Sequence, residues 1–290
     1  MELRAIVMGL AFAMMWSSAF ASARIIVSAA PPLGSLALRF LVSGLLAVAL
    51  ARLMGQSWRL SRAQWRATIV FGLCQNALYL GLNFVAMQWV EASLASIIAS
   101  VMPLLVALAS WLLFKERLRP LGYAGLLAGI VGVTLIMGAR LQGGADPLGV
   151  GLCVLGVISL AVATMSVRGA ITGGNVMMIV GLQMLVGSAL LWPVAIAFET
   201  PQVDWSWRLV AAFSYTVLVP GVAATFLWVV LVERIGAIRA ATFHFLNPFF
   251  GVAVAAVLLG EPMGVYDVIG VAIITAGILA VQLSRLSSRK

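Results

Sequence analysis

Residues 92–138 read ASLASIIASVMPLLVALASWLLFKERLRPLGYAGLLAGIVGVTLIMG, two long apolar runs separated by a short basic segment. Residues 237–283 begin 145 positions later, read AIRAATFHFLNPFFGVAVAAVLLGEPMGVYDVIGVAIITAGILAVQL, and align with the first stretch without gaps. The identical positions are Ala92/Ala237, Ala95/Ala240, Pro103/Pro248, Leu113/Leu258, Glu116/Glu261, Gly125/Gly270 and Gly132/Gly277. The shared Pro, Glu and Gly residues are not apolar background. They predict an internal repeat with halves 1–145 and 146–290.

The composition around this repeat is that of a membrane protein. Of the 290 residues, 63% are hydrophobic and 9% are charged, and the mean hydropathy is +1.12. A hydrocarbon core about 30 Å thick needs about 20 apolar residues per helix. Apolar runs bounded by charge, Pro or Gly occupy 4–28, 33–53, 66–88, 93–114, 120–139, 149–168, 175–198, 208–233, 238–259 and 264–284. We therefore expect an all-α polytopic protein with ten transmembrane helices.

The basic residues indicate how these helices cross the membrane. With a cytoplasmic N-terminus, 14 of the 18 Lys and Arg residues fall in segments on the inner side. The outer segments hold only Arg24, Arg140 and Arg208, together with most of the acidic residues. Cytoplasmic loops are enriched in Lys and Arg. Both termini are therefore expected to be cytoplasmic.

Five helices in each half have a consequence for orientation. Five is an odd number, so the second half enters the membrane from the side opposite to the first. The loop holding Glu116 is then cytoplasmic, and the loop holding Glu261 is not. The sequence therefore predicts two inverted five-helix repeats.

Several functional classes are disfavoured. The net charge of +9 is spread in clusters between apolar runs rather than gathered in a basic patch, so no nucleic-acid partner is expected. Cys74 and Cys153 lie in apolar runs without Cys or His neighbours, and hydrolase and nucleotide-binding motifs are absent from the sequence. We expect no metal, no cofactor and no enzymatic activity.

The third predicted helix carries a polar face. Gln75, Asn76, Tyr79 and Asn83 fall on one side at 3.6 residues per turn. Polar groups avoid lipid, so this face is expected to point inward and to line a solute pathway. Hydrogen bonding between helices is the alternative use of such residues.

The fourth and ninth predicted helices share a proline. Ser96 and Ser100 precede Pro103, and Pro248 occupies the matching position of the second half. Proline removes a backbone donor and bends a helix. The paired bends are candidates for gating hinges, and a static bend is the alternative.

Other candidates come from aromatic and ionisable side chains. Trp16 and Trp228 lie well inside their helices and could stack on a flat substrate. His244, the single histidine, lies one turn before Asn247 and could serve packing, substrate binding or proton transfer. Arg39 lies about two turns inside its helix. We expect it to reach the outer headgroups or a structural partner, with a substrate carboxylate as the third option.

Small residues recur on the last helix of each half. Gly122, Gly125, Gly129 and Gly132 in one, and Gly270 and Gly277 in the other, permit close helix contact. Packing within the chain is the first interpretation and homodimer contact the second. A monomer or weak homodimer in the lipid bilayer is expected.

A family resemblance is carried by several motifs taken together: Trp16-Ser17-Ser18, Pro31-Pro32, Arg39 and the repeated Ala, Pro, Leu-x-x-Glu and Gly pattern. The chain resembles the drug/metabolite transporter superfamily of the EamA type, and most of all the YddG-type exporters of aromatic and other neutral amino acids. The resemblance implies a basket-like bundle with helices 1, 3, 4, 6, 8 and 9 around a central cavity, helices 2 and 7 beside it, and 5 and 10 behind.

The expected function is therefore export of amino acids or related small metabolites across a bacterial inner membrane by alternating access, as a facilitator. The alternatives are a multidrug or other metabolite efflux carrier, which could be proton-coupled, and a scaffold or receptor that transports nothing. The expected substrate-binding residues are Trp16, Ser17, Gln75, Asn76, Tyr79, Asn83, Ser96, Ser100, Trp228, His244 and Asn247, with Pro103 and Pro248 as gating residues.

Overall fold

The computed structural model describes residues 3–114, 119–166, 175–235, 240 and 242–287. Within these ranges every regular element is helical and none is a strand. In the same ranges, nine helical segments are long and apolar enough to cross a membrane, and a shorter apolar helix covers Asn247–Leu259. The all-α polytopic fold predicted from the sequence is confirmed.

Five of the predicted spans are single helices: α3 (Pro32–Leu53), α8 (Pro120–Gln142), α9 (Pro147–Ser166), α10 (Val176–Phe198) and α15 (Val265–Ser287). The other five are divided: α1 (Leu3–Ser17) and α2 (Ala19–Val27); α4 (Arg62–Phe71), η1 (Gly72–Leu80) and α5 (Gly81–Ala86); α6 (Ala92–Ser100) and α7 (Met102–Phe114); α11 (Trp207–Thr216), η2 (Val217–Ala223) and α12 (Ala224–Ile235); η3 (Thr242–Leu246) and α14 (Asn247–Leu259). These bounds agree with the predicted segments to within a few residues, except that the end predicted at residue 168 and the start predicted at residue 238 lie outside the described residues.

Local sequence explains where several helices begin. Pro32, Pro120 and Pro147 each occupy the first position of their helix. Proline suits that position, because its φ is already helical and its missing N–H would have no partner in the first turn. Before α4, the Ser61 side chain accepts a hydrogen bond from the Gln64 backbone N–H, and the Gln64 side chain accepts one from the Ser61 N–H. This capping box satisfies two free donors of the first turn.

The breaks inside the spans recur in both halves. The π-helices η1 and η2 lie in the third and eighth spans, which are equivalent in the predicted repeat. In the fourth span the α-helix is interrupted at Val101, and Pro103 is the second residue of α7. In the ninth span Pro248 is the second residue of α14. The helices are thus interrupted where the prolines predicted a bend.

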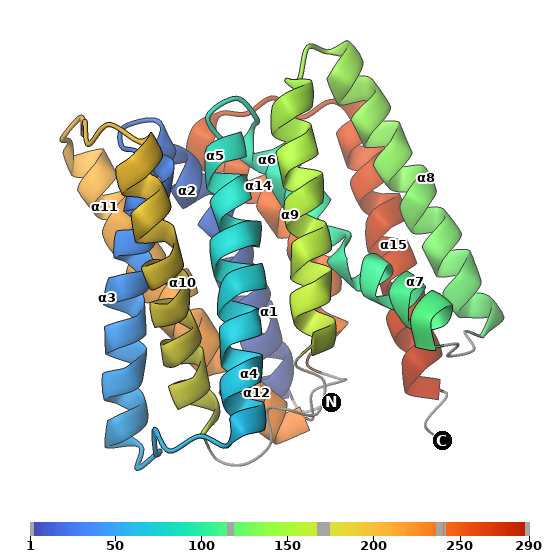
Figure 1. Ribbon diagram of the computed structural model, residues 1–290. Helices are drawn as coiled ribbons and strands as arrows, with labels where there is room; N and C mark the ends of the chain where they lie inside the picture. The colour runs from blue at the N-terminus through green and yellow to red at the C-terminus, as the bar shows by residue number, and fades with distance from the viewer. Residues whose placement is uncertain (1–2, 115–118, 167–174, 236–239, 241, 288–290) are drawn as a thin grey trace.

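Small residues bring helices of the two halves together. α8 packs along α15, and α3 packs along α10 (Figure 1). A Cβ built on Gly125 would lie 2.6 Å from the Gly277 carbonyl oxygen, and one on Gly132 would lie 3.0 Å from that of Gly270. Residues 125 and 132 are the repeat equivalents of 270 and 277, so these two contacts exchange under the repeat. This reciprocity is what a two-fold axis between α8 and α15 would produce.

The two ends of the bundle differ. The start of α1 and the end of α15 lie together at the lower end in Figure 1. We call the opposite end, formed by residues 28–31, 87–91, 143–146, 199–206 and 260–264, the upper end. It is the end that the charge distribution predicts to face outside.

Carboxylates tie the upper end together. Glu261 accepts hydrogen bonds from the backbone N–H groups of Ala92 and Ser93, which begin α6. Arg140, at the end of α8, forms ion pairs with Glu91 and with Asp267 of α15. A carboxylate at a helix N-terminus satisfies free donors and the helix dipole. Elements of both halves are therefore held against one another at the upper end.

Candidate functional site

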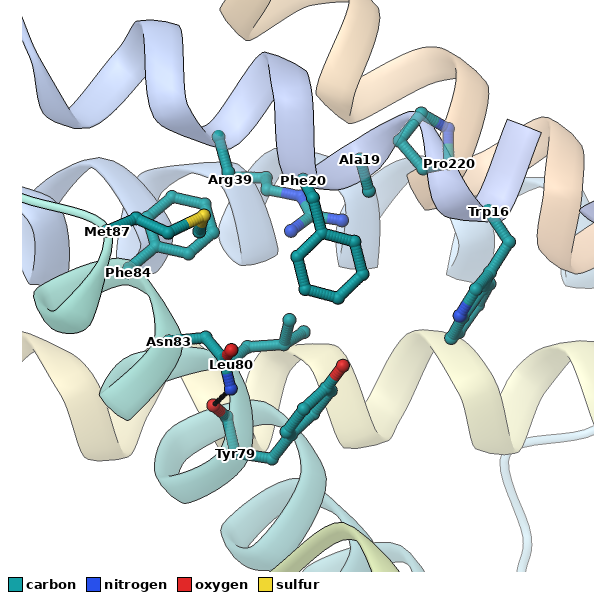
Figure 2. A pocket seen from close by; sticks show the side chains of 11 residues that line it. Trp16, Ala19, Phe20, Arg39, Tyr79, Leu80, Asn83, Phe84, Met87 and Pro220 are labelled. Atoms are coloured by element: carbon teal, nitrogen blue, oxygen red, sulfur yellow. Dashed lines mark hydrogen bonds between the residues drawn. The ribbon is translucent and has the colours of Figure 1, made fainter. Parts of the chain in front are cut away.

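A cavity of about 40 Å³ lies inside the bundle, at the ends of several broken helices. Its lining residues are Trp16 of α1, Ala19, Phe20 and Ala23 of α2, Arg39 of α3, Tyr79 and Leu80 of η1, Asn83 and Phe84 of α5, Met87 directly after α5, and Pro220 of η2. Figure 2 shows these side chains converging from opposite helices. A water needs roughly 10–15 Å³ by this measure. The cavity therefore has room for a few waters, and a larger solute requires the helices to separate.

The walls of the cavity are mainly aromatic and aliphatic. Phe20, Phe84, Trp16 and the ring of Tyr79 supply flat apolar surface. The backbone stays helical at Ser18 between α1 and α2, so Trp16 and Phe20, four residues apart, lie on the same side of the span and face the same cavity. Aromatic faces of this kind stack on flat or apolar solutes.

Arg39 is the charged residue of the lining, and its place differs from our expectation. Its side chain is 6% exposed and reaches the cavity rather than the headgroups. The guanidinium carbon lies 5.4 Å from the centre of the neighbouring Phe40 ring, and the Nε atom is buried without a hydrogen-bond partner. The expectation of snorkelling was wrong, because α3 packs against α10 and α5 and presents this residue to the bundle interior.

The polar face predicted on the third helix divides between two uses. Tyr79 and Asn83 line the cavity. Asn76 instead donates a 2.8 Å hydrogen bond to the Gln183 carbonyl of α10, so its amide holds two helices together. Gln75 is half-buried and is not among the cavity residues. A π-helix holds more residues per turn than an α-helix, so η1 rotates Asn76 away from the direction of Tyr79.

Asn83 combines a satisfied and an unsatisfied group. Its amide nitrogen donates to the Tyr79 carbonyl at 2.8 Å. Its Oδ1 atom is buried and has no hydrogen-bond partner in the described structure. The cavity thus contains an amide oxygen that can accept a hydrogen bond from a solute.

The serines of the fourth span serve close packing between α6 and α14. A Cβ built on Gly251 would lie 1.8 Å from Ser96 Oγ, so only glycine fits opposite that serine. Ser100 Oγ donates to the Ser96 carbonyl at 2.7 Å, within its own helix. Both serines are buried away from the cavity lining. Pro103 and Pro248 are buried next to this helix pair, which is where a change of bend would move α6 against α14.

Trp228, His244 and Asn247 belong to a second region. The ring of Trp228 lies 4.9 Å from His244 in an edge-to-face arrangement, and Phe12 lies 4.7 Å from Trp228 and 5.2 Å from His244. Phe12 also lies 5.7 Å from Trp16, which borders the cavity. This aromatic cluster joins α1 to α12 and η3 beside the cavity. Asn247 begins α14 just beyond it.

Of the expected binding residues, Trp16, Tyr79 and Asn83 are thus brought together at the cavity. Ser17 is buried next to Trp16 but is not a lining residue. Sequence reasoning missed Phe20, Phe84, Met87 and Pro220, and it assigned Arg39 elsewhere. A charge two turns inside an apolar helix was the signal available for Arg39. The apolar lining residues gave no such signal in the sequence, because apolar residues occur throughout membrane helices.

The family model of the EamA-like transporter family matches residues 3–138 and, separately, residues 147–283. The chain is 27% identical over 273 residues to the uncharacterized transporter YvbV of Bacillus subtilis (strain 168), covering 92% of this chain and 88% of YvbV. It is 26% identical over 278 residues to the uncharacterized inner membrane transporter YedA of Escherichia coli (strain K12), covering 93% and 88% of the two chains.

A solved crystal structure of a protein shares the fold. The TM-score is 0.70, and the superposition covers 97% of this chain and 98% of that one at 24% sequence identity.

Proposed function

Because the chain belongs to the EamA-like transporter family, we propose that it exports aromatic and other neutral amino acids, or related small metabolites, across a bacterial inner membrane. The membrane assignment follows from its helices, and the relative YedA is named an inner membrane transporter. Two separate family matches, one in each half, support the proposed pair of repeats.

The observation that carries the proposal is the cavity inside the bundle. It combines aromatic walls from Trp16, Phe20 and Tyr79 with polar groups from Arg39 and Asn83. Small-molecule sites are typically apolar enclosures with a few directed polar groups. A membrane protein whose helices only had to pack would gain nothing from such a space, because unfilled volume costs dispersion contacts.

Alternating access explains the small size of the cavity. Glu261 and the Arg140 ion pairs join helices of both halves at the upper end, and we propose that these contacts open when a solute passes between the cavity and the outside. The interrupted helices at Pro103 and Pro248 are the proposed points of bending. Broken helices at equivalent positions of two repeats are a common feature of transporters.

We further propose facilitated diffusion rather than proton coupling. Among the acidic residues whose side chains the structure describes, all six lie at the upper end or next to it: Glu91, Asp146, Glu199, Asp204, Glu261 and Asp267. Proton-driven carriers usually hold a carboxylate inside the membrane. His244 is the described side chain that could replace it, and it is packed against Phe12 and Trp228.

Counterflow in liposomes tests the proposed function. Purified protein is reconstituted with internal unlabelled phenylalanine, leucine or a non-amino-acid drug, and uptake of the same labelled compound is measured. We expect exchange of the amino acids by the wild type and at least tenfold less by Trp16→Ala, with Trp205→Ala, an exposed tryptophan, as the matched control. Exchange of drugs alone would indicate a multidrug carrier, and exchange of nothing in a broad panel of solutes would leave a scaffold or receptor.

A further inference from the structure

Arg39 is a buried cation whose described surroundings do not neutralise it. Arg39 is 94% buried and makes no hydrogen bond or ion pair with a described residue, and its guanidinium contacts the Phe40 ring. Two acids of the upper end are engaged elsewhere: Glu199 accepts from the N–H groups of Leu33 and Gly34, and Glu91 pairs with Arg140. A guanidinium taken out of water without a partner costs free energy.

The position of the Arg39 side chain indicates which kind of partner could neutralise its charge. Figure 2 shows the Arg39 guanidinium next to the Phe20 side chain, among the residues that line the cavity. An aliphatic residue would fill the same position of α3 at lower cost if packing were its purpose. An anion that occupies the cavity would supply the missing acceptor, and a carboxylate matches the planar fork of guanidinium donors.

A second unpaired group lines the same cavity. Asn83 Oδ1 is buried without a partner, because its amide nitrogen is the atom bonded to Tyr79. The cavity therefore presents a cationic donor and a neutral acceptor, and the described lining contains no acid. Because both groups line one cavity of about 40 Å³, a ligand that satisfies both has a carboxylate and an amino or hydroxyl donor close to it.

We infer that the cavity recognises the head group of a 2-amino or 2-hydroxy acid, with Arg39 binding the carboxylate and Asn83 Oδ1 accepting from the 2-substituent. The rest of the ligand lies against Phe20, Tyr79 and Trp16. This inference rests on the proposed transport function and adds to it the chemistry that defines the substrate class. An amine or amide that lacks the carboxylate leaves the charge of Arg39 unpaired and should bind more weakly.

Binding to the protein in lipid nanodiscs tests this separately from transport. Isothermal titration calorimetry compares phenylalanine, 3-phenyllactate, 3-phenylpropionate and phenylalaninamide, with leucine and leucinamide as an aliphatic pair. We expect the two 2-substituted phenyl acids to bind best, 3-phenylpropionate to bind about fivefold more weakly for lack of one neutral hydrogen bond, and the amides to bind at least tenfold more weakly than their acids.

Variants assign the two contacts. Arg39→Met should weaken binding of the acids about ten- to a hundredfold without weakening that of the amides, and Arg39→Lys should retain part of the preference. Asn83→Leu should lower the affinity for phenylalanine to that for 3-phenylpropionate. Arg208→Met removes an exposed charge outside the cavity and is the matched control.

Thermal stability separates ligand binding from a structural role. Removing an unpaired buried charge should leave the ligand-free Arg39→Met protein as stable as the wild type or more stable. A lower melting temperature together with an unchanged preference for acids over amides would overturn the inference, as would equal binding of acids and amides by the wild type or binding of neither. Acid-selective, Arg39-dependent binding without counterflow would instead reject the transport function and keep the inference.

Discussion

The carboxylate of Glu261 lies 2.8 Å from the backbone nitrogen of Ala92 and accepts its hydrogen bond. Glu261 belongs to the connection between α14 and α15, whereas Ala92 is the first residue of α6. The contact therefore joins a loop of the second half to a helix of the first half at the upper end. Because the neighbouring Ser93 N–H bonds to the same carboxylate, the side chain caps α6 with both oxygens.

Glu261→Gln should loosen this closure. Glutamine retains a single acceptor and loses the charge, which costs about 0.5–2 kcal/mol at a helix N-terminus. In a background with Cys74 and Cys153 replaced, the cavity residue Ala23→Cys should then react several-fold faster with an impermeant thiol reagent added outside. Asp204→Asn, which removes an exposed upper-end carboxylate, should not change the rate. Unchanged reactivity of both variants would show that Glu261 does not control opening.

Gly125→Leu should disrupt the packing of α8 on α15. The new side chain would meet the Gly277 carbonyl, Ala280 and Val281, where a Cβ alone already lies within 3.0 Å of each. Overpacking of this kind typically costs about 1–3 kcal/mol. The measurement is the melting temperature in detergent, with Gly138→Leu on the same helix as control, because no atom lies within 4 Å of its Cβ position. Equal melting temperatures of the two variants would contradict the close contact.

Tyr79→Ala and Asn83→Ala should depress transport about tenfold or more, a larger effect on transport than on detergent stability, because both residues line the cavity. Asn76→Ala should show the opposite pattern. It removes the hydrogen bond to Gln183 and should lower stability by about 0.5–1.5 kcal/mol with a smaller effect on transport. Counterflow and thermal unfolding are measured on the same preparations. Normal transport by both cavity variants would assign the whole face to packing.

His244→Ala should not abolish net flux in liposomes without any ion gradient, since the proposed mechanism moves substrate down its own gradient. His244→Phe keeps a ring against Phe12 and Trp228 and separates the loss of an ionisable group from the loss of packing. A pH-sensitive dye inside the liposomes reports proton movement. Substrate-dependent proton flux of fixed stoichiometry that both variants lose would identify His244 as a coupling residue and refute facilitated diffusion.

Cysteines introduced at Asp146 or Asp204 should react with impermeant reagents from outside intact cells, and those at Arg62 or Arg119 only after the inner face is opened. The first two positions lie at the upper end and the other two at the lower end, where the termini of α1 and α15 also lie (Figure 1). The positive-inside distribution assigns the lower end to the cytoplasm. The reverse labelling pattern would invert the proposed topology and, with it, the direction of the gating contacts.

Hydropathy alone was sufficient to predict the spans, because each spanning helix must satisfy its own backbone in lipid and its length is set by the bilayer. Pro103 and Pro248 likewise predicted the interruptions of the fourth and ninth helices, because a missing backbone N–H acts locally. The glycines of α8 and α15 predicted a close helix contact, and the structure shows this contact between α8 and α15 of the same chain.

Which side chains share a cavity was decided by tertiary structure. Tyr79 and Asn76 are three residues apart and equally polar, yet η1 turns one toward the cavity and the other toward α10. Arg39 could be recognised as a charge in an apolar helix, but its direction depends on how α3 packs against its neighbours. Phe20 and Phe84 resemble any lipid-facing residue until helices from distant parts of the chain meet around them. Sequence therefore determined where the chain forms apolar helices suited to a membrane, because that constraint acts along single helices. The site depends on helix rotation and on contact between helices, which no single helix encodes.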